Sequence, residues 1–261
     1  QAVERIFQAK GRPADNPLIV HVAERSQLDA IVTEIDPLAE RLMRQFWPGP
    51  LTIVLPARPG AVAPNVTAGL ETVAVRMPAH PLALALIREA GFPLAAPSAN
   101  RSGRPSPTTA AHVLDDLSGQ VDLVLDGGAC GIGLESTVVQ ITKGTIALLR
   151  AGGISRAQLQ EASGGMLREG EPPATAEHHA DSTPRSPGMK YKHYAPSAEM
   201  VVVTGSKEKV IARVHAEVTA ARQQGRKVGV LTYVEHAAHY DADAVVACGR
   251  LEQPKETARR L

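Results

Sequence analysis

The sequence has few cysteines, few aromatic residues and almost no net charge, and each shortage narrows the possible functions. Its 261 residues include only two cysteines, Cys130 and Cys248, which form no CxxC pair. This indicates a reducing compartment and no zinc site. A net charge of +1 and 3% aromatic residues give no sign of a basic surface with interleaved aromatics, which single-strand RNA-binding modules use. No apolar run approaches the ~20 residues of a membrane span, and no signal peptide is visible, so we expect a cytoplasmic protein with no membrane partner.

The sequence does contain an alternation of helical and strand-like patterns up to residue 163. The strand-like runs are 18–22, 51–55, 72–77, 121–125, 137–141 and 145–149. Helical patterns cover 1–10, 81–90 and 106–117; two more helices begin at Ser26 with Asp29, as a weak capping box, and at Asp36-Pro37. This order predicts an α/β fold with an open twisted mixed sheet, because the adjacent runs near 137–149 favour an antiparallel pair.

After residue 163 the composition changes. Residues 164–187 are rich in Gly, Pro, Ala, Ser and charge without periodicity, which is typical of a linker. A strand at 200–204, a helix at 206–224 and a strand at 228–232 follow, and this order predicts a small Rossmann-like β-α-β domain. We therefore expect a catalytic domain at 1–163, a linker and lid at 164–197, and a second domain at 198–261.

The segment from Lys10 to His21 carries the clearest chemical signal. Lys10 and Arg12 bracket a glycine, and a turn containing Asn16 leads into an apolar strand. Two cations held by a turn beside a strand suit the phosphates of a nucleotide. The alternative is an ordinary helix end, in which Lys10 complements the dipole, Gly11 caps the helix and the next proline stops it. The spacing by itself favours the alternative.

Four further segments occur with this one in an order that is specific. The five are Lys10–His21, Thr72–Pro78, Ala96–Gly103, Gly133–Val139 and Ser186–Pro196. Together they closely resemble the threonylcarbamoyl-AMP synthases of the YrdC-domain family, in its longer two-domain branch. The resemblance runs through most of residues 1–196. It implies a YrdC-like first domain, and the expectation that the sequence is clipped at both ends, because it begins at Gln1 inside a helical pattern and stops at Leu261.

The resemblance implies an enzyme that joins L-threonine, bicarbonate or CO2, and ATP into threonylcarbamoyl-AMP and releases pyrophosphate, with Mg2+ accompanying ATP. The product would serve threonylcarbamoyl modification of the adenosine next to the tRNA anticodon, through a downstream transfer machinery. The carbamate of threonine is itself the nucleophile, so no paired carboxylates are required. Catalysis then rests on neutralising phosphate charge and holding the reactants in line.

The resemblance also implies site residues. The expected ATP contacts are Lys10, Arg12, Asn16, Thr72, Ser98, Asn100, Ser106, Arg150 and His193. The expected threonine contacts are His21, Arg76, Ala96 and Ser136. No residue is assigned a catalytic role beyond positioning, and no protein metal ligand is assigned.

Several of these residues have an ordinary structural alternative. A lone histidine in a strand, such as His21, is more often a hydrogen-bonded structural residue. Ser98 and Asn100 could shape a turn, Ser106 could cap a helix, and Arg150 could be a solvated strand-end charge. Arg76 is the exception, because an arginine in an apolar strand is costly unless it has a partner, and the α-carboxylate of threonine suits its bidentate fork.

Two further features bear on function. The family's Thr-Glu-Thr-Val-Tyr-Gly segment, which helps to enclose threonine, would lie before Gln1 and is absent from the sequence. Residues 186–196 hold lysines, tyrosines and His193 in close succession, which favours a lid that excludes water from a labile adenylate. The alternative function is an RNA-binding or ribosome-maturation module of the same fold without catalysis, in which direct tRNA binding would matter.

Overall fold

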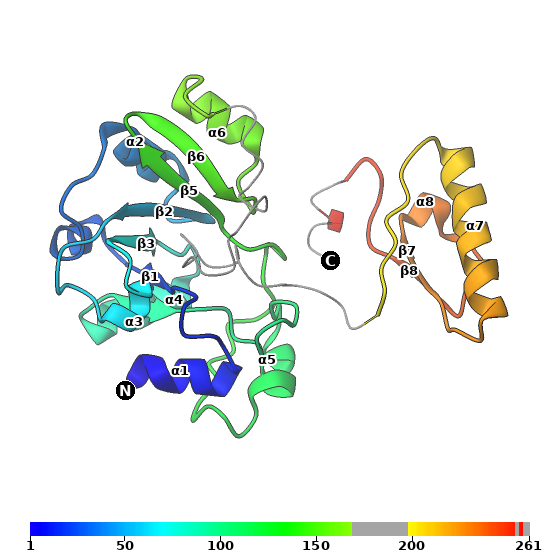
Figure 1. The fold of residues 1–261 in the computed structure, drawn as a ribbon, viewed down its shortest axis with the longest axis horizontal. Coiled ribbons are helices and arrows are strands. Elements are labelled where there is room, and N and C mark those ends of the chain that lie inside the picture. Colours follow the sequence, from blue (N-terminus) through cyan, green and yellow to red (C-terminus); the bar gives the residue numbers. More distant parts are fainter. Residues whose placement is uncertain (169–197, 254–255, 258–261) are drawn as a thin grey trace. The chain divides into compact units, whose positions relative to one another are not determined.

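The structure is a computed structural model that describes residues 1–168, 198–253 and 256–257 (Figure 1). The chain divides into two compact units, each of which is described by itself. The first comprises Gln1–Ala129 with Glu135–Ala195, and the second comprises Cys130–Leu134 with Pro196–Leu261. Most of the predicted linker and lid, including His193, lies outside the described residues.

The first unit is built on a six-stranded sheet with the order β4-β1-β3-β2-β5-β6. The strands are β1 (Ile19–His21), β2 (Leu51–Pro56), β3 (Thr72–Arg76), β4 (Leu94–Ala96), β5 (Thr137–Thr142) and β6 (Thr145–Arg150). β1 runs parallel to β3 and β2 runs parallel to β5, whereas the other neighbouring strands are antiparallel. The predicted mixed α/β sheet is confirmed.

The first unit also contains seven described helices. They are α1 (Ala2–Lys10), the 3-10 helix η1 (Arg25–Ala30), α2 (Pro37–Phe46), α3 (Pro64–Thr67), α4 (Pro81–Ala90), α5 (Ala110–Leu117) and α6 (Arg156–Ser163). Gly11 ends α1 in the left-handed conformation (φ 58°), and Asp36 caps α2 by accepting from the Leu38 N–H. Both ends lie where the sequence predicts them, because glycine tolerates positive φ and aspartate accepts from free N–H groups.

The main core lies on one face of this sheet. In β2, Leu51, Ile53 and Leu55 join that core, while Thr52 and Val54 point to the opposite face. The core also includes side chains from helices α1, α2, α3, α6 and η1. The opposite face carries a smaller cluster, whose buried members are Ile19, Val54, Ala74, Val138 and Leu149. Strand alternation therefore separates a packing face from a second face on which polar side chains can be presented.

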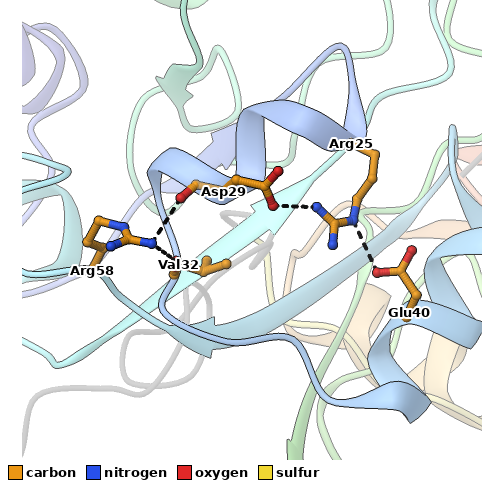
Figure 2. A network of polar contacts seen from close by, with 5 residues as sticks. All are labelled: Arg25, Asp29, Val32, Glu40 and Arg58. Carbon is orange, nitrogen blue, oxygen red and sulfur yellow. Dashed lines mark hydrogen bonds and ion pairs between the residues drawn. The ribbon is translucent and has the colours of Figure 1, made fainter.

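A network of ion pairs and hydrogen bonds connects η1 to its neighbours (Figure 2). Arg25 contacts Asp29 at 2.7 Å and Glu40 of α2 at 3.1 Å, and Arg58 donates to the carbonyls of Asp29 and Val32. The network ties η1 to α2 and to the end of β2, on exposed surface where each pair contributes little by itself.

The sequence prediction for the start of η1 was wrong in detail. The capping box consists of Glu24 and Gln27, whereas Ser26 and Asp29 lie inside the helix. Gln27 is the better partner, because its longer side chain can reach back to the N-cap backbone: its Oε1 accepts from the Glu24 N–H at 3.3 Å and from the preceding Ala23 N–H at 2.7 Å.

Two other predicted elements of the first unit differ from the structure. Residues 121–125 form no strand, and Leu123 is 74% exposed, so alternation there occurs without a pairing partner in the described sheet. α5 begins at Ala110 and is capped by Thr109, four residues after the serine expected to begin it. At the predicted linker, Leu167 is buried and forms a bridge with Ile146 of β6, so residues up to 168 continue to pack on the sheet.

The second unit has a smaller sheet, in which β7 (Gly229–Thr232) and β8 (Ala244–Ala247) pair in parallel. Its helices are α7 (Lys207–Gln223) and α8 (Val234–Ala237). The predicted helix at 206–224 and strand at 228–232 are confirmed, but the predicted strand at 200–204 is wrong, and Val202 is 79% exposed. The β-α-β order is therefore β7-α8-β8. None of the helices in the described part of the chain is both long enough and apolar enough to span a membrane.

Candidate functional site

A row of polar side chains crosses the second face of the large sheet at one end of its strands. His21 of β1 pairs with Arg76 of β3. Continuing the pairing of Ile53 with Val75 by one residue places Thr52 beside Arg76. Thr52 pairs with Val138, which pairs in turn with Arg150 of β6. His21, Arg76, Thr52 and Arg150 therefore share one level of the sheet, although they come from four separate strands.

Arg76 is a largely buried cation with few protein partners. Its Nε donates to the Gly49 carbonyl at 2.9 Å, and its Nη groups make no hydrogen bond within the described residues. No carboxylate in this part of the chain forms an ion pair with it. Burial and then the nearby charge of Arg150 lower the pKa of Arg76. A desolvated guanidinium with open donors favours an anionic ligand with two acceptor oxygens.

Ser136 lies directly before β5 and is held by two side chains of the row. Arg150 donates to the Ser136 carbonyl at 2.8 and 3.1 Å and to its hydroxyl at 3.0 Å. The same hydroxyl lies 2.7 Å from the Thr52 hydroxyl. Ser136 is 2% exposed and Thr52 is fully buried. Arg150 is thus a fixed part of this arrangement, and the interpretation of it as a solvated strand-end charge is wrong.

His21 lies next to Arg76 and is neutral at physiological pH. Burial, and after it the positive charge of Arg76, lowers the pKa of His21 to about 4. The backbone groups of Leu94 and Ile19 partly oppose this fall in pKa. The Nδ1 atom is buried and has no hydrogen-bond partner of good geometry among the described residues. The interpretation of His21 as a hydrogen-bonded structural residue therefore leaves one ring nitrogen unexplained.

A second group of predicted residues gathers where β1 and β3 begin. The Lys10 ammonium donates to the carbonyls of Ser98 and Asn100, and to the Asn100 side-chain oxygen at 3.2 Å. Burial, and after it the charge of Arg12, lowers the pKa of Lys10 to about 8. The Asn100 amide nitrogen donates to the carbonyls of Arg101 and Arg104. Lys10 and Asn100 therefore fix the loop after β4 to the end of α1.

Arg12 organises the turn that leads into β1. It donates to the carbonyls of Asn16 at 3.2 Å and Pro17 at 2.8 Å. Asn16 is 1% exposed, so the end of this turn next to β1 is buried, whereas Pro13 and Ala14 are exposed. The turn therefore combines a fixed cation with a buried amide.

Three of the four buried side-chain polar atoms without a hydrogen-bond partner in the described residues belong to predicted contact residues. They are Asn16 Oδ1, His21 Nδ1 and Ser106 Oγ. An unpaired buried polar atom costs about 1–3 kcal/mol, so each one calls for a partner. The structure also removes the alternative role of Ser106, because Thr109 caps α5. These unpaired atoms favour a ligand that supplies the missing hydrogen bonds.

The remaining predicted residues lie toward the second group. Thr72 is at the opposite end of β3 from Arg76, about 13 Å away at the usual rise of a strand. Ala96 ends β4 opposite Ile19, and Ser98 follows it. The structure therefore brings Lys10, Arg12, Asn16, Ser98 and Asn100 together at one end of the sheet. It brings His21, Arg76, Ser136 and Arg150 together at the other.

Sequence reasoning missed Thr52, Gly49 and Gly152. Thr52 is a lone hydroxyl in an apolar strand, and that oddity is a signal of the kind that identified Arg76. A Cβ on Gly152 would lie 2.5 Å from the Ser136 carbonyl carbon, and a Cβ on Gly49 would clash with the Phe46 carbonyl. Glycine at 152 therefore lets the backbone pass against Ser136, a requirement that a Gly-Gly pair after a strand hints at.

The described residues contain no group of three His, Cys, Asp or Glu side chains that could hold a metal ion. The site instead presents cations, hydroxyls and amides. A donor set of this kind binds anions, and a divalent cation would enter it on the phosphates of a ligand.

Comparisons with known proteins cover the whole chain. The family model described as "Telomere recombination" (Sua5_yciO_yrdC) matches residues 1–152, and the model described as "Threonylcarbamoyl-AMP synthase, C-terminal domain" matches residues 154–261. The chain is 49% identical to the threonylcarbamoyl-AMP synthase of Bacillus subtilis and 48% identical to that of Pyrococcus abyssi. Both matches span 100% of this chain, and 72% and 73% of the relatives.

Solved structures agree with these sequence matches. The crystal structure of P. abyssi Sua5 complexed with L-threonine superposes with a TM-score of 0.89 at 46% identity, over 99% of this chain and 73% of that one. The structure of E. coli YciO matches with a TM-score of 0.52 at 28% identity, over 58% of this chain and 73% of that one.

Proposed function

The chain belongs to the YrdC family of threonylcarbamoyl-AMP synthases, and from this membership we propose how its residues divide the substrates between them. The function is the family's, namely formation of an adenylate from ATP, L-threonine and bicarbonate or CO2 for tRNA modification. This is a nucleotidyl transfer. We propose that the row of polar side chains holds threonine and that the group around Lys10 holds the phosphates.

The threonine half of the proposal rests on the chemistry of Arg76, His21 and Ser136. Arg76 offers the open donors that a bidentate carboxylate requires. The Ser136 hydroxyl and neutral His21 would supply further hydrogen bonds to the amino acid. The backbone of Ala96 adds a further contact at the end of β4. The relative crystallised with L-threonine supports an amino-acid site in this fold.

The ATP half rests on the turn and the loop that Lys10 and Arg12 organise. The phosphates would meet the charges of these two cations, the amide of Asn16, and the hydroxyls of Ser98 and Ser106. Asn100 would act from the same loop, and Thr72 would contact the nucleotide on the sheet face. Because the Lys10 ammonium already donates to three protein oxygens, it contributes loop geometry and long-range charge. ATP enters as its magnesium complex, which keeps the metal on the substrate.

Arg150 links the two halves. It belongs to the proposed ATP contacts, yet it is bonded to Ser136 at the threonine end. The carbamate formed from threonine and CO2 must reach the α-phosphorus of ATP, so one cation has to serve both reactants where they meet. The carbamate oxygen then forms the new bond to phosphorus, and pyrophosphate leaves with the electron pair. Positioning and charge neutralisation account for this chemistry without a protein base.

The observation that carries the proposal is the largely buried Arg76, whose Nη groups have no hydrogen-bond partner in the described residues. Mass spectrometry of the reaction products tests it, with ATP, bicarbonate, threonine and Mg2+ present and each omitted in turn. Threonylcarbamoyl-AMP and pyrophosphate should appear only in the complete mixture. Formation of ADP would refute adenylate chemistry.

A further inference from the structure

The strand β2 carries a hydroxyl, that of Thr52, which the assignment of substrates leaves unused. Thr52 lies on the second face of the sheet, between Arg76 of β3 and Val138 of β5, and is fully buried. Its other neighbours along β2, Leu51 and Ile53, belong to the apolar core. A buried hydroxyl in such a strand is costly unless it is hydrogen-bonded. Its one hydrogen bond in the described structure is to the Ser136 hydroxyl, at 2.7 Å.

The direction of that hydrogen bond follows from a count of donors and acceptors. The Ser136 hydroxyl has one hydrogen and two lone pairs, and Arg150 already donates to one lone pair at 3.0 Å. If Ser136 donated to Thr52, the buried hydrogen of Thr52 would have no acceptor. If Thr52 donates to Ser136, both lone pairs of Ser136 are occupied and its hydrogen is left for a ligand. Without a ligand, each arrangement leaves one buried hydroxyl hydrogen unpaired. A bound anion can accept the hydrogen of Ser136, so the second arrangement is the one that pairs every donor once the anion binds, and it is favoured for that reason.

We infer that Thr52 is a positioning residue, which turns the Ser136 hydroxyl into a donor toward the carboxylate or carbamate of the amino-acid substrate. This inference rests on the proposed function, because it requires that an anionic group of threonine binds beside Ser136. It adds a residue that touches no substrate. A hydroxyl fixed as a donor complements the Arg76 guanidinium, because both then offer hydrogen to the same anionic end.

The test compares Thr52→Val with Thr52→Ser in the full chain. Pyrophosphate release is measured with threonine varied at saturating ATP, and then with ATP varied at saturating threonine. Thr52→Val should raise the KM for threonine about tenfold, as expected for loss of a hydrogen bond to a charged group. The KM for ATP should stay within about twofold, since its contacts remain. Thr52→Ser, which keeps the hydroxyl, should restore the threonine KM.

Two controls separate positioning from damage to the fold. Thr67→Val removes another buried threonine hydroxyl, one that donates to Pro64 within α3, and should leave both KM values unchanged. In a Ser136→Ala background, Thr52→Val should add no further effect, because the two residues act as one unit. Equal rises in both KM values, or a full additional effect in that background, would overturn the inference.

Failure of the proposed function gives a different result. A wild-type chain that binds threonine but forms no adenylate refutes the enzyme activity, and calorimetric titration with threonine then decides about Thr52 separately. A weaker threonine Kd in Thr52→Val that Thr52→Ser restores would support the positioning role. An unchanged Kd, or a wild-type chain that does not bind threonine, would refute it.

Discussion

Lys10 and Arg76 are cations at opposite ends of one sheet, and their donors are used in opposite ways. The Lys10 ammonium donates to three oxygens of the loop after β4, whereas Arg76 donates to a single backbone carbonyl. Both side chains are poorly solvated, and burial is the first cause of the lowered pKa of each. The donors of Lys10 are therefore used by the protein before any ligand arrives, whereas Arg76 keeps donors open for a ligand.

The comparison assigns different functions to two residues that look alike in the sequence. A cation saturated by protein carbonyls gives shape to a loop, and its removal leaves buried oxygens unpaired. A cation with open donors gives affinity, and its removal relieves the fold of a desolvated charge. Substitution of Lys10 should therefore lower stability more than substrate binding, and substitution of Arg76 should lower substrate binding more than stability.

Arg76→Ala gives the largest expected effect on function. Loss of a bidentate partner for a carboxylate should raise the KM for threonine about a hundredfold or more, with a much smaller change for ATP. Arg76→Lys should restore little, because a point charge does not reproduce the planar fork. Steady-state kinetics with each substrate varied provides the measurement. Equal losses for both substrates would show that Arg76 is structural, and the comparison would fail.

Lys10→Met tests the other end through stability. The substitution keeps an unbranched side chain but leaves the carbonyls of Ser98 and Asn100 without their donor, so the free energy of unfolding should fall by about 2–4 kcal/mol. Urea denaturation monitored by circular dichroism measures this change. Arg76→Ala serves as the matched control and should change stability by less than about 1 kcal/mol. A larger loss in the Arg76 variant than in the Lys10 variant would contradict the proposed difference between the ends.

Strand alternation in the sequence predicted which face of the sheet His21 and Arg76 occupy. The other contacts of the row became known only from the structure. His21 and Arg76 alternate with valines, so their shared face was readable from the sequence, and the register then makes them neighbours. Thr52 was missed because a single hydroxyl in an otherwise apolar strand forms no alternating pattern of polar and apolar residues. The bonding of Arg150 to Ser136 depends on the β5–β6 pairing, and no local pattern contains that information.

The two wrongly predicted strands share a cause. Residues 121–125 and 200–204 have the apolar content of strands, but a strand requires a partner, and neither segment has one among the described residues. Short apolar runs carry no information about pairing. The separation of Thr72 from Arg76 has a different origin, because both their common face and their placement at opposite ends of β3 follow from a spacing of four residues in one strand.

The pH dependence of stability should report on His21, at the end of the sheet that holds Arg76. Because the pKa of His21 falls to about 4 in the fold, the unfolded chain binds a proton between pH 6.5 and 4 that the folded chain does not. Stability from this source is complete above pH 6.5 and is lost as the pH falls toward 4, by on the order of 3 kcal/mol. Urea denaturation from pH 7 to 4 should show this loss, and His21→Gln should flatten it. An unchanged slope in that variant would show that His21 is not a buried neutral residue.

Ser106→Ala gives the smallest expected effect, and stability and ATP binding should change in different directions. Its hydroxyl is buried, has no partner among the described residues and does not cap α5, so removing it should leave the stability of the free protein unchanged or slightly raised. If the hydroxyl awaits a phosphate oxygen, the KM for ATP should rise several-fold, as expected for one neutral hydrogen bond, and the KM for threonine should stay constant. Thermal unfolding with and without ATP then distinguishes the free from the ATP-bound protein, because ATP should stabilise the wild type more than the variant.

Thr109→Ala is the matched control, since it removes a hydroxyl that does cap α5. It should lower stability by about 1 kcal/mol without a specific effect on ATP binding. A loss of stability in unliganded Ser106→Ala equal to that of Thr109→Ala would mean that Ser106 has a structural partner and that the end of the sheet around Lys10 is complete without ATP.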